Sequence, residues 1–203
     1  SPDDPGLIEI RRGESGIRAW AAEPGEYYHS FDGSYGGLWR RNGRPPQLLA
    51  GVGFSAQGKF EGSYYRRTAE SRAPDLAWMF EGIEDQEILG DFGFSGGGAA
   101  GFELDRADVR LGTPEEVRVV ASSENHTSSF VLVPEEMLTH ITNWPGEEEQ
   151  QKLIRSDIVY FRTPSGGEVF STGSITFCGS LPWNDFDNNI SRLLENVIRR
   201  FLQ

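Results

Sequence analysis

Cysteine is almost absent from this chain, since Cys178 is the single cysteine among 203 residues. One cysteine cannot form a disulfide within the chain, and it excludes a zinc site of the C-x-x-C type. Apolar residues and glycine flank Cys178, a setting typical of a small buried hydrophobe rather than a nucleophile. We therefore expect a reducing, cytoplasmic setting.

Positive charge is also scarce, with 19 lysines and arginines against 31 acids and a net charge of -12. Nucleic acids and anionic membranes both attract clustered cations, so we expect neither as a partner. Long hydrophobic runs are missing too: the sequence has no stretch of about 18 apolar residues and no basic-then-apolar start. We therefore expect no membrane span and no signal peptide, and a single domain over residues 1–203.

Short apolar segments separated by turns predict an α/β fold of the mixed α+β, β-rich kind. A regular apolar stripe from Ile190 to Leu202 predicts a C-terminal amphipathic helix, capped by Asp187 or Asn188, that anchors the domain. Pro134 opens a short helix that ends near Thr142. The charged run 147–151 is expected to be a solvated face. Strands are expected at residues 7–10, 17–20, 48–54, 76–80, 117–121, 130–133, 158–161 and 168–172.

Two apparent motifs carry little weight. The run GGGAAG at residues 96–101 matches G-x-G-x-x-G, but no amphipathic helix follows it, so we do not expect nucleotide binding. The chain also lacks G-x-S-x-G, which disfavours a serine nucleophile.

A loop at residues 23–46, EPGEYYHSFDGSYGGLWRRNGRPP, gathers tyrosines, a histidine and acids between glycines and prolines. Phenolate and carboxylate oxygens suit ferric iron, because anionic oxygen donors match a small, highly charged cation. The candidate ligands are Tyr35 or Tyr28 from this loop and Glu124 or Glu103 from later loops, with His29 and His126 as acids or bases. The alternative interpretation is an aromatic loop that only covers a sheet.

Three parts of the sequence resemble the C-terminal region of the large (beta) subunit of the N,N-dimethylformamidase family. They are the run EPGEYYHSFDGSYGGLWRRNGRPPQLLAGVGFSAQG, the segment GDFGFSGGGAAGFELDRAD followed by LGTP, and the tail GGEVFSTGSITFCGSL with DNNISRLLENVIRRFL. The resemblance implies a hydrolase that splits small N-substituted formamides into formate and an amine. It also implies one iron held by two tyrosines and a glutamate, in the later part of a class I glutamine amidotransferase or flavodoxin-like domain with extra strands and long loops.

Carried onto this sequence, the family pattern makes Tyr35 one metal ligand and Glu124 another, with Tyr28 and Glu103 as alternatives. The segment Gly-Gly-Asn-Gly-Phe-Tyr, which the family pattern places upstream with the other tyrosine, is absent here. We therefore expect the chain to be the C-terminal portion of a longer polypeptide, whose isolated form binds iron weakly or not at all. His126 is the predicted catalytic group, accepting a proton from metal-bound water or donating one to the leaving amine.

Two functions follow as hypotheses. The first is part of an iron-dependent formamide hydrolase that acts as a homo-oligomer and works with an upstream segment and a small partner subunit. The second is a binding or assembly module without catalysis, for example for carbohydrate, with stacking platforms at Trp39, Tyr64, Tyr65 and Trp183.

Overall fold

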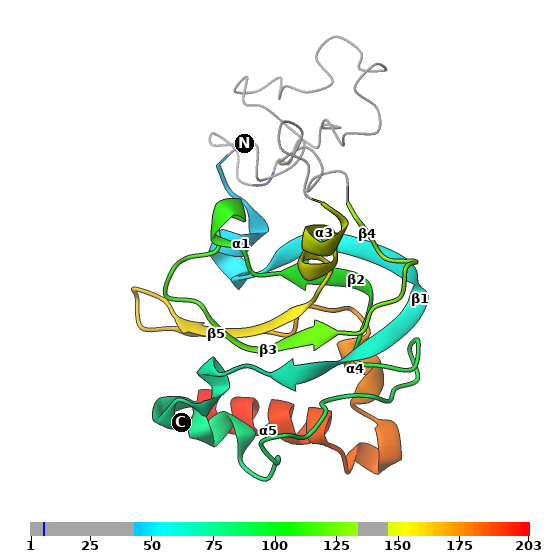
Figure 1. Ribbon diagram of the computed structural model, residues 1–203. Coiled ribbons are helices and arrows are strands. Elements are labelled where there is room, and N and C mark those ends of the chain that lie inside the picture. Colours follow the sequence, from blue (N-terminus) through cyan, green and yellow to red (C-terminus); the bar gives the residue numbers. More distant parts are fainter. Residues whose placement is uncertain (1–5, 7–42, 134–145) are drawn as a thin grey trace.

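The computed structural model describes residue 6, residues 43–133 and residues 146–203. These residues form one curled antiparallel sheet between two sets of helices. Helices α1 (Pro46–Ala50) and α3 (Glu147–Leu153) lie on one side of the sheet, and α5 (Asn189–Phe201) lies on the other (Figure 1). The expected β-rich, mixed α+β fold with a closing C-terminal helix is thereby confirmed.

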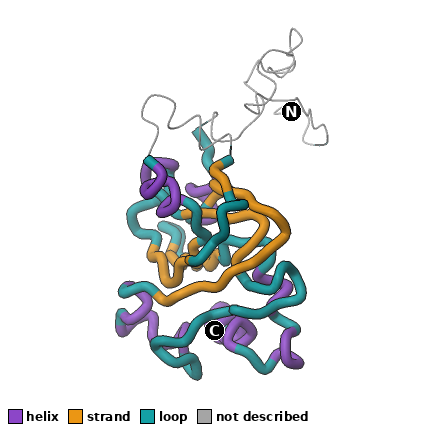
Figure 2. The backbone as a smooth tube through the Cα atoms, turned by 45° about the vertical axis from the view of Figure 1, so that its right-hand side comes forward, coloured by secondary structure: helices purple, strands orange, loops and turns teal. Residues whose placement is uncertain are grey.

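The long strand β1 (Gly53–Arg67) joins the two parts of the sheet. Its first part pairs with β2 (Ala100–Arg106) and with the short β4 (Val131–Leu132), and its last residues pair with β3 (Arg118–Glu124). The register with β2 shifts twice along β1, and such irregularities increase local bend and twist. The sheet therefore curls around its own axis (Figure 2).

The remaining strands extend the sheet on the β3 side. β3 pairs with β5 (Asp157–Arg162), and β5 pairs with β6 (Glu168–Ser171), so the order is β2-β1-β3-β5-β6. Every strand pair in the described part of the chain is antiparallel. Flavodoxin-like folds are built on parallel strands, so the expected amidotransferase or flavodoxin-like topology is not confirmed.

Helix α5 follows its predicted pattern. Ile190, Leu193 and Val197 are fully or almost fully buried in the main core, where the helix packs against the 3-10 helix η3 (Pro74–Phe80). Asn188 caps the helix, because its side-chain oxygen accepts a 2.9 Å hydrogen bond from the Ser191 backbone N–H. The predicted stripe is wider than the buried face, since the last apolar residues (Ile198, Phe201 and Leu202) are exposed.

Two predicted strands are wrong. At residues 48–54, α1 occupies the first positions and β1 begins only at Gly53, because prolines favour a helix start and Gly51 ends it in the left-handed conformation at φ 78°. At residues 76–80, η3 takes the place of the strand, and this helix again has a proline, Pro74, at its start. Short apolar runs cannot separate helix from strand by periodicity alone.

Other predictions at this level are confirmed. β3, β4, β5 and β6 overlap the strands expected at residues 117–121, 130–133, 158–161 and 168–172. Helix α3 has no buried residue, as expected for a solvated face. The strands expected at residues 7–10 and 17–20 and the helix expected from Pro134 lie outside the described residues.

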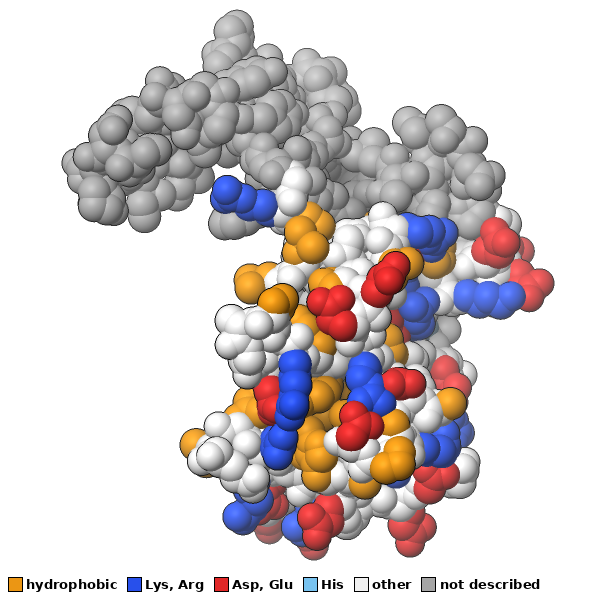
Figure 3. Space-filling model, turned by 90° about the vertical axis from the view of Figure 1, so that its left-hand side faces the viewer, with side chains coloured by type: hydrophobic (Ala, Val, Ile, Leu, Met, Phe, Trp, Pro, Cys, Tyr) orange, Lys and Arg blue, Asp and Glu red, His pale blue; other side chains and the backbone are white. Residues whose placement is uncertain are grey.

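Short helices complete the described chain: η2 (Glu70–Arg72), η4 (Val109–Leu111), α4 (Phe177–Ser180) and η5 (Trp183–Phe186). Among the described residues, no helix is long and apolar enough to cross a lipid bilayer. On the face shown in Figure 3, lysine and arginine side chains alternate with acids instead of forming one basic patch.

Candidate functional site

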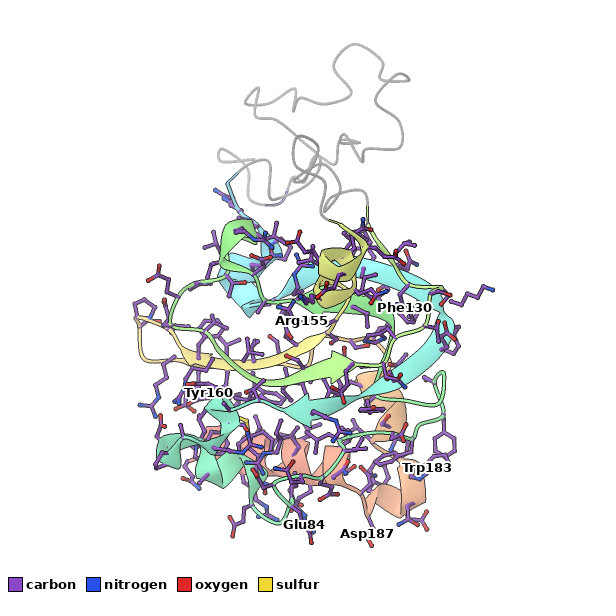
Figure 4. The ribbon with its side chains drawn as sticks, in the orientation of Figure 1. Glu84, Phe130, Arg155, Tyr160, Trp183 and Asp187 are labelled. Carbon is purple, nitrogen blue, oxygen red and sulfur yellow. The ribbon has the colours of Figure 1, made fainter. Side chains whose placement is uncertain are left out.

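A cleft of about 650 Å³ lies between the end of β3 and helix α3. The turn after β3 supplies one wall, which includes Glu124 and His126, and α3 with the residues after it supplies the other. Phe130 and Arg155, which both line the cleft, lie below α3 in Figure 4, with Phe130 to the right of Arg155. Both walls carry polar side chains, and such groups can orient a small polar ligand.

Hydrogen bonds from arginines fix the α3 wall to the sheet. The buried Arg106 donates from Nη1 to the carbonyl of Leu153, the last residue of α3, at 2.8 Å. Arg155 donates to the carbonyl of Ala107 at 3.1 Å and to the carboxylate of the buried Asp157 at 3.0 Å. The cleft is therefore bounded by anchored elements on the α3 side.

His126 turns back from the end of β3 toward the sheet. Its Nε2 lies 2.6 Å from the Ser123 hydroxyl oxygen, and its ring centroid lies 4.8 Å from that of Phe130. Its Nδ1 is buried and has no hydrogen-bond partner among the residues that the structure describes. Burial lowers the pKa of His126 to about 4, against the opposing effect of the negative charge of Glu61. The ring is therefore neutral at pH 7 and can accept a proton or donate a hydrogen bond.

Glu124, the last residue of β3, points toward β1. Its carboxylate forms an ion pair with the guanidinium of Arg66, and both side chains are 46% exposed. The residue between Glu124 and His126, Asn125, has a left-handed backbone with φ 62°. The turn is therefore not extended at Asn125, although Glu124 and His126 both line the cleft.

The described residues do not by themselves supply a set of metal ligands, since they contain no group of three or more His, Cys, Asp or Glu side chains suited to a metal ion. Tyr35, Tyr28 and His29 lie outside the described residues. Glu124 does line the cleft, but its carboxylate must leave Arg66 before it can bind a cation. Glu103 lies on β2 opposite Gln57, away from the cleft.

Sequence reasoning missed Ser123 and Ser156. The Ser123 side chain, only 5% exposed, accepts a 2.7 Å hydrogen bond from the Ser156 backbone N–H in addition to its contact with His126. A serine so enclosed is not a nucleophile, and its contacts suit it to holding the imidazole. The only signal in the sequence is a serine three residues before a histidine, and this spacing is too common in proteins to indicate a site.

Of the stacking residues of the second hypothesis, the structure excludes Tyr65. Tyr65 is fully buried, and its hydroxyl group donates to the Thr172 carbonyl at 2.8 Å, so burial raises its pKa well above the usual range. Arg66 lies over the ring of Tyr64 at 5.6 Å, and Trp183 packs against Phe92. Trp39 lies outside the described residues.

Cys178 is exposed, so its predicted burial is wrong. It lies on the short helix α4, where the neighbouring Phe177 takes the inward position at 1% exposure.

Comparison with known proteins gives consistent matches over the whole chain. Residues 1–189 match the family model described as "N,N-dimethylformamidase beta subunit-like, C-terminal". Two proteins named N,N-dimethylformamidase beta subunit, from an Alcaligenes species and from Paracoccus aminophilus, are each 40% identical over 202 residues, which is 100% of this chain. The chain spans 26% of the length of each of these relatives.

Proposed function

Because the chain belongs to the N,N-dimethylformamidase beta subunit-like family, we propose that it is part of an iron-dependent hydrolase of small N-substituted formamides, which releases formate and an amine. The observation that carries this proposal is a neutral, partly buried imidazole, His126, placed beside a carboxylate, Glu124, in a cleft with polar walls. Such a group can serve hydrolysis at neutral pH.

The residues of this chain have separate roles in the proposal. Glu124 supplies one carboxylate ligand after it leaves Arg66, and Tyr35 supplies a phenolate ligand. Iron, when bound, would act as a Lewis acid toward the amide carbonyl. His126 acts on the reacting amide from the same wall of the cleft as Glu124, and Arg106 with Arg155 keeps the α3 wall in place.

The rest of the polypeptide belongs to the proposal as well. Since the named relatives are about four times as long as this chain, we assign the remaining metal ligand to a segment outside it. We assign an amidotransferase-like parallel sheet to that remainder too. A homo-oligomer in the cytoplasm, assembled with a small subunit, completes the proposed enzyme.

The test uses the complete polypeptide that contains this chain, with iron content and formate release from N,N-dimethylformamide as readouts. We expect Glu124→Gln to lose iron with little loss of stability, because a neutral amide is a poor ligand for a hard cation. Glu103→Gln is the matched control and should keep iron. Loss of iron in the Glu103 variant alone would move the ligand to β2.

Tyr35→Phe tests the second ligand in the same assay. We expect loss of iron or of turnover, because the variant removes only the phenolate oxygen. Full iron occupancy and normal turnover in this variant would transfer the role to Tyr28 or end the proposal.

A further inference from the structure

The hydrogen bonds around Ser123 restrict the protonation of the His126 ring. A serine hydroxyl has one proton to donate and two lone pairs. One lone pair of Ser123 accepts the Ser156 backbone N–H at 2.7 Å. The other described neighbour of this oxygen is Nε2 of His126, at 2.6 Å. The state of the ring then depends on which of these two atoms carries the shared proton.

The two neutral tautomers leave different groups without partners. If Nε2 carries the proton, it donates to Ser123, and the serine proton has no acceptor among the described residues. Nδ1 is then also an acceptor without a partner. If Ser123 donates to Nε2, the serine proton and Nε2 both have a partner. Only the N–H at Nδ1 is then left without one. Each unsatisfied buried group costs about 1–3 kcal/mol, so the second arrangement is favoured.

We propose that Ser123 is a positioning residue that holds His126 in the tautomer with its proton on Nδ1. His126 then carries its N–H at the buried Nδ1, while its basic nitrogen, Nε2, is occupied by the serine hydroxyl. This assignment rests on the distances around Ser123 and holds whether or not the chain hydrolyses amides.

The assignment also deepens the proposed function, on which its catalytic part rests. Nδ1 is buried in this structure, so an N–H on it can donate to the carbonyl oxygen of a substrate amide only after a local movement uncovers it. It would then stabilise the negative charge that develops on that oxygen. No proton needs to be transferred, because the bond from nitrogen to hydrogen stays intact. Accepting a proton at Nε2 would instead require the Ser123 hydroxyl to turn away.

The direct test is nitrogen NMR of the complete polypeptide labelled with ¹⁵N in its histidine rings. Protonated and unprotonated ring nitrogens resonate in well-separated regions, and the His126 signals are those that His126→Gln loses. We expect the wild-type protein to carry its proton on Nδ1 at neutral pH. A proton on Nε2 would overturn the proposal without any need for a Ser123 variant.

Variants of Ser123 test the positioning role. Ser123→Ala should lose the preference for Nδ1, and Ser123→Thr should keep it because the hydroxyl remains. If Ser123→Ala does not fold, Ser123→Cys replaces it, and its weaker donor should reduce the preference. An unchanged tautomer in a folded Ala or Cys variant would show that Ser123 does not set it.

Turnover separates this inference from the proposed function. In a protein that releases formate, we expect Ser123→Ala to lower turnover about 10- to 100-fold with iron content unchanged, and Ser123→Thr to restore it. We also expect His126→Asn, whose amide N–H lies near the position of Nδ1, to retain more turnover than His126→Ala. Equal loss in these two His126 variants would contradict the donor role. Absence of formate release from the wild-type protein would reject the proposed function and leave the tautomer result standing.

Discussion

Replacing Asp108 by asparagine tests the hydrogen bonds and charges around Arg106, which fixes the α3 wall of the cleft. The Asp108 carboxylate accepts hydrogen bonds from Arg110, and from Arg106 at 3.1 Å, and the same Arg106 fixes the end of α3 through the Leu153 carbonyl. Burial alone would raise the pKa of Asp108, but the hydrogen bonds of Arg110 and the charge of Arg106 outweigh it and lower the pKa to about 2. The side chain is only 9% exposed, so water screens this interaction weakly.

The sign and size of the effect follow from linkage. A carboxylate with a pKa of about 2 in the folded chain and about 3.9 in the unfolded chain contributes about 2.6 kcal/mol to the free energy of unfolding. Because the folded pKa is the lower one, this contribution is present above about pH 4 and is lost as the pH falls through 2. By pH 3, about 1.2 kcal/mol of it should already be lost.

Urea unfolding followed by tryptophan fluorescence at pH 6 and pH 3 measures this difference. We expect the free energy of unfolding of Asp108→Asn to fall less between these pH values than that of the wild-type protein, by about 1 kcal/mol. Glu115→Gln, at an exposed position, is the control and should follow the wild type. An equal fall in Asp108→Asn and wild type would refute the argument that this carboxylate is held in its charged form by the arginines.

Two further predictions concern packing, with thermal and urea unfolding as the measurements. Gly101→Ala should lower the free energy of unfolding by about 1–3 kcal/mol, because its new Cβ would overlap the Glu61 carbonyl oxygen and come within 2.6 Å of the Gly62 Cα. Gly146→Ala, with no described atom within 4 Å of such a Cβ, should change the free energy of unfolding little. Leu193→Ala, at a fully buried position of α5, should cost about 2–5 kcal/mol, and Ile198→Ala, at a position 49% exposed, should cost far less. Similar costs within either pair would contradict the packing described here.

Hydrophobic periodicity was sufficient to predict an element that buries one face. The stripe that begins at Ile190 repeats over several turns, so it predicted α5, with Asp187 or Asn188 as its cap, and the structure shows that the cap is Asn188. The strands β5 and β6 were predicted because both runs are rich in β-forming residues, and the structure closes the turn between them with a 2.7 Å hydrogen bond from the Thr163 N–H to the Gly167 carbonyl.

Hydrophobic periodicity could not predict the long strand β1 and its partner β2. Their sequences contain small and polar residues where a regular strand would alternate, because β1 bends and its glycines approach β2 closely. Gly98 and Gly101 show this directly, since an added Cβ at either position would overlap the backbone of β1. The run that imitates a nucleotide-binding motif is therefore explained by strand packing.

The site shows a different limit of sequence reasoning. Residue types placed Glu124 and His126 close together, which a separation of two residues guarantees. They could not predict the left-handed Asn125, which directs Glu124 toward Arg66 while His126 returns to Ser123. Arg66 comes from the neighbouring strand β1, and its contact with Glu124 depends on the register of β1 against β3, which no local pattern specifies.

These partners give the two residues different freedom to react. The ion pair of Glu124 with Arg66 is nearly half exposed, and exposed pairs of this kind are weak because water and salt screen them. Ser123 and the Ser156 N–H that binds it are buried, so breaking their hydrogen bond or the contact with His126 leaves polar groups without partners. A cation or an anionic ligand can therefore displace Arg66 from Glu124 at little cost, while the His126 ring keeps its orientation. If the proposed function holds, Glu124 is thus the residue that can be released to bind a cation, and His126 is the residue that stays fixed.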